Sequence, residues 1–94
     1  SVVDFGDMKA GDTKSRSVNL SNDGSENLYI ETEVDGAEVF KLNLTVNGNL
    51  WNNFSANIIK NSSSDIQLGL TIPNNYSGSF GEQEGGLTFW AVKQ

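Results

Sequence analysis

The side chains best suited to chemistry in this sequence are asparagines that stand two residues before Ser or Thr. This spacing is the acceptor pattern for N-linked glycans in secreted proteins. It occurs five times, whereas 12 Asn and 16 Ser plus Thr in 94 residues would give about two by chance. The excess predicts a glycosylated chain, and the candidate glycosylation sites are Asn19, Asn43, Asn53, Asn61 and Asn75.

Carboxylates could hold a cation or serve as a general acid and base. Six of them stand in two groups, which are Glu31, Glu33, Asp35 and Glu38, then Glu82 and Glu84. Ca²⁺ takes carboxylate oxygens from loops, but the Asp-x-Asp-x-Asp spacing of a calcium loop is missing. A chain of 94 residues also offers little room for a substrate cleft between two carboxylates. The sequence therefore favours a solvated acidic surface and predicts neither a metal site nor catalytic residues.

Composition excludes several classes of chemistry. The chain has no Cys and no His, so it cannot form disulfides, thiolate nucleophiles, zinc fingers or a Ser-His-Asp triad. Twelve Asp plus Glu against six Lys plus Arg give a net charge of −6, which argues against nucleic acid as a partner. No apolar run approaches the ~20 residues of a membrane span, so membrane insertion is not predicted. Apart from covalent glycans, no cofactor is expected.

Four large aromatic side chains could bind a partner, and they are Tyr29, Trp51, Tyr76 and Trp90. Aromatic rings form platforms for sugars, and they are also enriched at protein interfaces and in cores. Tyr29 and Trp90 fall on outward-facing positions of the alternating pattern, which favours a carbohydrate-binding module. A further core contact or a subunit interface is the alternative, and it is the one the sequence favours.

The elements that would position these residues are short strands. Apolar and polar residues alternate with a period of two, without a stretch of helical period. The alternating segments are 2–8, 17–21, 27–34, 40–47, 53–58, 66–72 and 87–92, and turn signals separate them. Among the turns, Asn47-Gly48 predicts a type I′ hairpin. Seven short antiparallel strands predict one all-β domain, 1–94, folded as an Ig-like antiparallel β-sandwich.

The glycan acceptors fall on favourable positions of this predicted sandwich. Asn19, Asn43 and Asn53 lie on the polar, outward register of their strands, and Asn61 and Asn75 lie in turns. Since a glycan must project into solvent, all five positions are compatible with one. This placement strengthens the prediction of a secreted chain.

The first third of the chain resembles known Ig-like domains. Asp4-Phe5-Gly6 leads to a Gly turn, then to a strand that ends in Asn22-Asp23-Gly24, and then to Leu28-Tyr29-Ile30. This order resembles the ASPM/SPD-2/Hydin-like domains and their prokaryotic surface relatives. The resemblance implies that Val3 and Phe5 fill the core and that Gly24 takes a positive φ in a hairpin turn.

A narrower resemblance lies in layout and composition. The chain begins and ends on predicted strands, is rich in glycan acceptors and has no Cys. In these respects it is similar to archaeal thread-type surface filament subunits and to TasA/camelysin-like fibre proteins of bacteria. The resemblance implies a subunit whose N-terminal strand completes the sandwich of its neighbour.

Residues 1–8 are the candidate donor strand, or else an ordinary first strand of their own domain. Val2, Val3 and Phe5 give this segment the extended, apolar character that strand exchange needs. The expected function is that of an extracellular, cell-surface structural protein, a filament or pilus subunit whose partners are copies of itself, serving adhesion or cell–cell contact. The alternative is a monomeric carbohydrate-binding or adhesin-type module cut from a larger surface protein, with surface glycans as partners.

Overall fold

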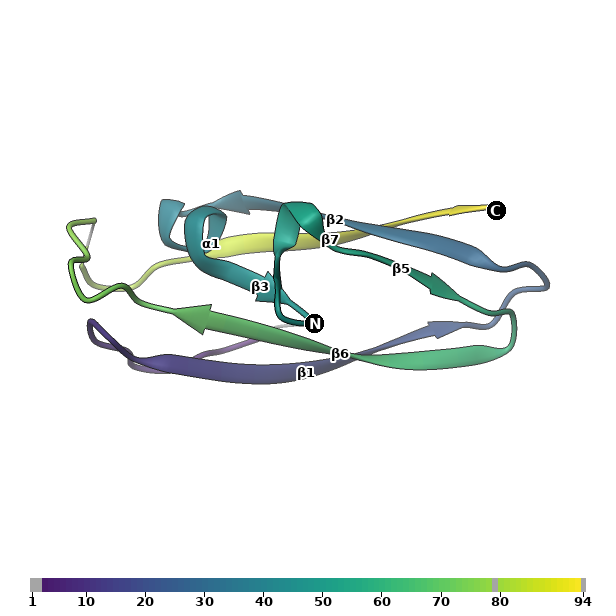
Figure 1. Ribbon diagram of the computed structural model, residues 1–94, viewed down its shortest axis with the longest axis horizontal. Coiled ribbons are helices and arrows are strands. Elements are labelled where there is room, and N and C mark those ends of the chain that lie inside the picture. The colour runs from purple at the N-terminus through teal and green to yellow at the C-terminus, as the bar shows by residue number, and fades with distance from the viewer. Residues whose placement is uncertain (1–2, 79, 94) are drawn as a thin grey trace.

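The fold is a sandwich of two antiparallel sheets. The computed structural model describes residues 3–78 and 80–93, and Figure 1 shows the two layers lying along the long axis. One sheet has the order β1-β6-β3-β4 and the other the order β5-β2-β7. The strands are β1 (Thr13–Asn22), β2 (Leu28–Gly36), β3 (Leu44–Val46), β4 (Asn49–Leu50), β5 (Ser55–Ile58), β6 (Ser62–Thr71) and β7 (Gly85–Lys93). The prediction of a seven-stranded antiparallel β-sandwich is confirmed.

The core lies between the sheets and is built from the apolar positions of the alternating segments. Buried side chains come from both layers, with Ile30 on β2, Val46 on β3, and Ile66 and Leu68 on β6. A second, smaller cluster of Val39, Leu70 and Ile72 lies near one end of the sandwich. The longer strands have one face in this core because side chains alternate across a sheet.

The hairpin between β3 and β4 follows the sequence prediction. Val46 pairs with Asn49, so the loop has two residues, Asn47 and Gly48. Their φ angles are 51° and 84°, and a type I′ turn requires positive φ at both central positions. Asn47 also ties the turn to β6, because its Oδ1 accepts a hydrogen bond from the Gln67 N–H at 2.8 Å.

The strand predicted over 40–47 is wrong in its first half. Residues Glu38–Asn43 form helix α1, followed directly by β3. The chain must cross here from β2 in one sheet to β3 in the other, and a helical turn makes that crossing (Figure 1). Val39 enters the core while Leu42 is 65% exposed, which the period-two pattern could not anticipate. The segment 53–58 likewise begins as a short 3₁₀ helix, η1 (Trp51–Asn53), before β5.

The strand predicted over 2–8 is also wrong for the residues that the structure describes. Residues 3–12 form no strand. Val3 is 37% exposed and does not fill the core, whereas Phe5 is half-buried and packs against both core clusters. Val2 lies outside the described residues.

The turn between β1 and β2 differs from the prediction as well. Gly24 is not among the positive-φ glycines of the described chain, and the position that shapes this turn is Asn22. Asn22 is 3% exposed and its amide group forms three hydrogen bonds. It donates to the Glu26 and Ile58 carbonyls at 2.7 and 2.9 Å, and its Oδ1 accepts from the Gly24 N–H at 3.1 Å. A polar side chain at the end of a strand therefore ties β1 to β5 in the other sheet.

Candidate functional site

The sheet edges differ in how well they are protected from pairing with another chain. β4 has two residues and β5 has four, and such short edges offer little to a partner. β1 is long but carries Lys14 and Arg16 on its inward register, and inward-pointing charges discourage edge pairing. β7 has nine residues, pairs only with β2 among the described residues, and has neither charge nor Pro before Lys93. Among the edges of the described strands, the free edge of β7 is thus the best suited to accept another strand.

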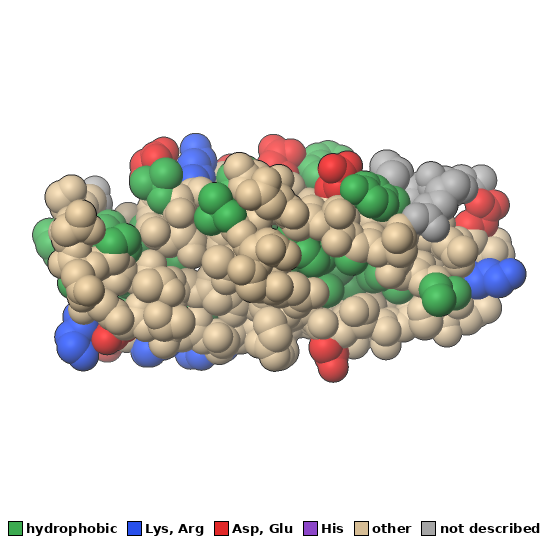
Figure 2. Space-filling view, in the orientation of Figure 1, with side chains coloured by type: hydrophobic (Ala, Val, Ile, Leu, Met, Phe, Trp, Pro, Cys, Tyr) green, Lys and Arg blue, Asp and Glu red, His purple; other side chains and the backbone are tan. Residues whose placement is uncertain are grey.

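The core beside this edge is only partly covered. Leu87 and Phe89 on β7 point inward and are half-buried, and Ala91 is exposed on the same register. Figure 2, which views the sandwich from the side of η1 and β5, shows apolar side chains in the gap between the two layers on that side as well. An additional strand at β7 would cover apolar surface as well as form backbone hydrogen bonds.

The N-terminal segment, residues 3–8, lies along β1 without joining its sheet. The Arg16 Nε donates to the Asp4 carbonyl at 2.9 Å, and the Lys14 Nζ donates to the Asp7 carbonyl at 2.7 Å. The Arg16 guanidinium also lies 5.8 Å from the centre of the Phe5 ring. Among the described residues, the backbone of 3–8 forms no backbone-to-backbone hydrogen bond with a strand. Side chains rather than a β-ladder therefore hold the segment in place.

Lys14 and Arg16 are functional candidates that the sequence prediction missed. Both occupy the register on which Val18 and Leu20 face the core, so a cation stands where the alternating pattern expects an apolar residue. That mismatch was a visible signal in the sequence. Its meaning depends on the segment 3–8, which lies beside β1 only in the folded chain.

A tight turn connects this segment to β1. The Asp12 carboxylate accepts a hydrogen bond from the Lys9 N–H at 3.0 Å and lies 3.4 Å from the Lys9 ammonium. The backbone hydrogen bond is the main cause that lowers the pKa of Asp12 below its usual 3.8, with the Lys9 charge adding to it. Any departure of residues 3–8 from β1 would pivot on this turn.

The lowered pKa of Asp12 predicts an acid-dependent part of the stability of this turn. Since the folded pKa lies below the unfolded one, the ionised carboxylate stabilises the fold above pH 3.8, and this contribution is lost as pH falls through the folded pKa. Urea unfolding should therefore show Asp12→Asn to be slightly less stable than the wild type at neutral pH. The difference should vanish in strong acid. A difference that persists there would mean that the carboxylate charge is not its cause.

The outer face of the three-stranded sheet brings together aromatic and acidic side chains. Trp90 on β7 is 56% exposed, and its Nε1 donates to the Glu33 carboxylate on β2 at 3.0 Å. Glu31 stands directly opposite Trp90 in the β2–β7 register. Tyr29, two residues before Glu31 on the same face of β2, is half-buried. The prediction that Tyr29 and Trp90 point outward on their strands agrees with this register.

The other two aromatic candidates lie elsewhere. Trp51 is half-buried in η1, and its Nε1 donates to the Lys41 carbonyl at 2.8 Å. Tyr76 belongs to the loop before β7 and meets Phe80 edge to face, with the ring centres 5.7 Å apart. The four large aromatics therefore do not form one platform.

The predicted glycan acceptors are not equally accessible. Four are exposed, and they are Asn19 on β1, Asn53 in η1, Asn61 in the turn before β6 and Asn75 in the loop after it. Asn43 is half-buried at the end of α1, and its amide donates to the Val39 carbonyl at 3.1 Å. The outward strand position predicted for Asn43 is wrong because the residue is helical.

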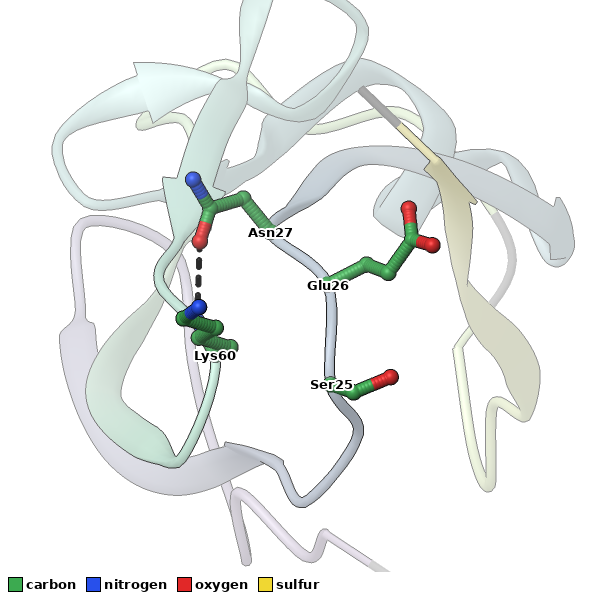
Figure 3. Close-up of a pocket in the computed structure, with 4 residues that line it drawn as sticks. All are labelled: Ser25, Glu26, Asn27 and Lys60. Atoms are coloured by element: carbon green, nitrogen blue, oxygen red, sulfur yellow. Dashed lines mark hydrogen bonds between the residues drawn. The ribbon is translucent and has the colours of Figure 1, made fainter.

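Two hollows lie at opposite ends of the molecule. A shallow one of about 290 Å³ is lined by Ser25, Glu26, Asn27 and Lys60, and Figure 3 shows the hydrogen bond from the Lys60 N–H to the Asn27 side chain. The other, of about 510 Å³, lies between α1 and the loop 73–84 and includes Leu42 and Tyr76 in its lining. Neither brings together groups suited to acid–base or nucleophilic chemistry.

Metal-ligating side chains do not cluster in the described part of the chain. Within the same residues, every helix is too short or too polar to cross a membrane. Comparisons with protein-family models, with curated proteins and with solved structures found no match. The features of the described chain that bear on its function are therefore the edges and faces of the sandwich.

Proposed function

We propose that this chain is an extracellular structural protein, an N-glycosylated subunit of a cell-surface filament that serves adhesion or cell–cell contact. The subunits assemble head to tail, and residues 1–8 of one copy add a strand to the free edge of β7 in the next. The observation that carries the proposal is the free edge of the nine-residue strand β7, which has no charge before Lys93 and no partner strand beyond β2 among the described residues.

The state of the N-terminal segment supports its role as the donor. Residues 3–8 lie along β1 without a β-ladder, held by hydrogen bonds from Lys14 and Arg16 and by the packing of Phe5 and Met8 against the core. A β-ladder on the β7 edge of a neighbour would satisfy backbone groups that now have no strand partner. The exchange therefore replaces side-chain contacts within one chain by ladder hydrogen bonds and side-chain packing between chains.

The direction of the strands supports a linear assembly. β1 begins at one end of the sandwich, where Thr13 pairs with Thr71, and β7 ends at the other, where Lys93 pairs with Leu28. A segment that precedes Thr13 and swings away from its own domain thus points along the 46 Å long axis towards another copy. Such a contact joins two different surfaces and does not close on itself, so repetition gives a filament.

The exposed glycan acceptors fit this assembly. Asn19 and Asn61 belong to the four-stranded side of the sandwich, and Asn53 and Asn75 lie in surface connections. None of these four is part of β7, so glycans attached to them would leave the accepting edge uncovered. The proposal therefore places glycans at the exposed Asn19, Asn53, Asn61 and Asn75 and excludes Asn43, which is half-buried at the end of α1.

Strand exchange is directly testable because the chain has no Cys of its own. One preparation carries Val3→Cys and the other Ala91→Cys; the two are denatured together, refolded and mildly oxidised. Exchange should bring the two thiols together and give a covalent heterodimer of about twice the 10.2 kDa chain mass, detected by mass spectrometry. Electron microscopy of the wild-type chain should show fibres.

The matched control pairs Val3→Cys with Ser17→Cys. Ser17 is exposed, like Ala91, but lies on the outer face of β1, away from the β7 edge. Heterodimer yields that are equal for the two pairs would refute the assigned edge. Monodisperse monomers without fibres would refute the filament and favour the monomeric binding module.

A further inference from the structure

Three features of the outer face of the β5-β2-β7 sheet together indicate the chemistry of a ligand that would bind there. It carries a broadly exposed aromatic ring, Trp90, and a second, half-buried ring, Tyr29. Glu31, Glu33 and Asp35 follow one another at every second residue along β2, on the same face. The described side chains of this face include no cation. A partner that binds this face would therefore contact both the negative charges and the aromatic rings.

One side-chain hydrogen bond positions the Trp90 ring on this face. Its only polar atom, Nε1, donates to Glu33 at 3.0 Å across the β2–β7 pair. This bond uses the polar edge of the indole and leaves its π face to solvent. Tyr29 lies diagonally across the same strand pair, since Trp90 faces Glu31 and Tyr29 is two residues away. Diagonal neighbours on a sheet are about 7–8 Å apart, so one extended ligand can reach both rings.

We propose that this face binds an oligosaccharide of positively charged amino sugars. The flat C–H faces of sugar rings stack on Trp90 and Tyr29, and the ammonium groups lie beside the carboxylates of Glu31 and Glu33. A neutral sugar would cover these carboxylates without compensating their charge, and burying an unpaired charge is costly. A cation gains both from the carboxylates and from the negative π face of the indole. The net charge of −6 on the chain attracts the same ligand over distance.

A basic peptide meets only part of this pattern. A Lys side chain brings a cation on a flexible stem but no rigid ring to lie flat on an aromatic platform. The pairing of two rings with a row of carboxylates favours a ligand that repeats both a ring and a charge. The site lies on the face of the sheet and not on its edge, so binding does not depend on whether subunits polymerise.

Calorimetric titration with two matched probes tests the proposal. One is the hexamer of β-1,4-linked glucosamine, and the other is the fully N-acetylated hexamer, which has the same rings and linkage but no charge. The glucosamine hexamer should bind at least about tenfold more tightly, and added salt should weaken its binding. Equal affinities for the two hexamers, or no heat from either at millimolar concentration, would overturn the proposal. So would a hexalysine peptide that binds as tightly as the glucosamine hexamer.

Variants locate the binding on this face. Trp90→Ala should lower the affinity for the glucosamine hexamer by about tenfold or more, and Glu31→Gln should lower it several-fold. Phe80→Ala and Asp23→Asn are the matched controls, because they remove an exposed ring and an exposed carboxylate elsewhere. Circular dichroism checks that each variant keeps the β fold. An affinity loss as large in the controls as in Trp90→Ala and Glu31→Gln would assign the binding to general charge and overturn the site.

Discussion

Replacing Gly36 by Ala is expected to destabilise the protein by about 2–5 kcal/mol. Gly36 has a φ of +92°, which residues with a side chain rarely adopt. A Cβ there would also lie 2.5 Å from the Gly85 Cα and 2.7 Å from the Glu84 carbonyl oxygen. These are backbone atoms at the start of β7 and in the residue just before it, and they cannot rotate away, so the β2–β7 pair must separate at this end. Urea unfolding monitored by Trp fluorescence measures the loss.

Gly48 provides the matched control for Gly36. It has a similar φ of +84°, but nothing lies within 4 Å of the position that a Cβ would take. Gly48→Ala therefore suffers the backbone strain without the clash and should cost only about 1–2 kcal/mol. If the two variants are equally stable, the close contact between the backbones of β2 and β7 does not add to the cost of Gly36→Ala and does not determine where β7 begins. The position of β7, and with it the position of the free edge proposed as the strand acceptor, would then have to depend on other contacts.

Replacing Asn22 by Asp is expected to cost about 3 kcal/mol or more at neutral pH. The change keeps the size and shape of the side chain but replaces its NH₂ group by an oxygen. Two donated hydrogen bonds, to the Glu26 and Ile58 carbonyls, are lost. A negative charge then faces two carbonyl oxygens at a position that is 3% exposed. Protonation of the new carboxyl in acid should restore part of the stability, because the neutral acid can donate one hydrogen bond.

Asn27 lies in the same connection and gives the control for Asn22. It is exposed, and its Oδ1 accepts a hydrogen bond from the Lys60 N–H at 3.0 Å. Asp keeps that acceptor, so Asn27→Asp should change the unfolding free energy by no more than about 0.5 kcal/mol. The urea midpoints of the two variants, each compared with that of the wild type, measure the two losses of stability. Similar losses in both would mean that any carboxylate in this turn is harmful and that Asn22 has no special role.

The Gly-rich stretch 81–86 illustrates what the alternating pattern could not explain. It is not simply a loose turn, because Gly85 and Gly86 allow β7 to begin in close contact with the end of β2. A Cβ on Gly85 would lie 2.7 Å from the Asp35 carbonyl oxygen, and one on Gly86 would lie 2.5 Å from an Asp35 carboxylate oxygen. Such close approaches depend on residues about fifty positions apart and are invisible in local sequence.

The sequence by itself determined the fold class and most of the core. Alternation with period two places Ile30, Val46 and Ile66 on buried faces because a strand presents every second side chain to the same side. The Asn47-Gly48 turn could be predicted for an equally local reason, since few other residue pairs tolerate positive φ at both positions. The absence of Cys and His likewise excluded whole classes of chemistry without any structure.

Only the tertiary structure decided which edges are paired and what the N-terminal segment does. The pattern of 2–8 looks like that of any strand, but strand formation requires a partner for the backbone, and pairing is a long-range property. Helix α1 replaced a predicted strand for a similar reason, because the crossing between sheets and not local alternation sets the path of 38–43. The outward positions of Tyr29 and Trp90 were visible in the sequence, whereas the Trp90–Glu33 bond and the free edge of β7 follow from how β2 and β7 pair.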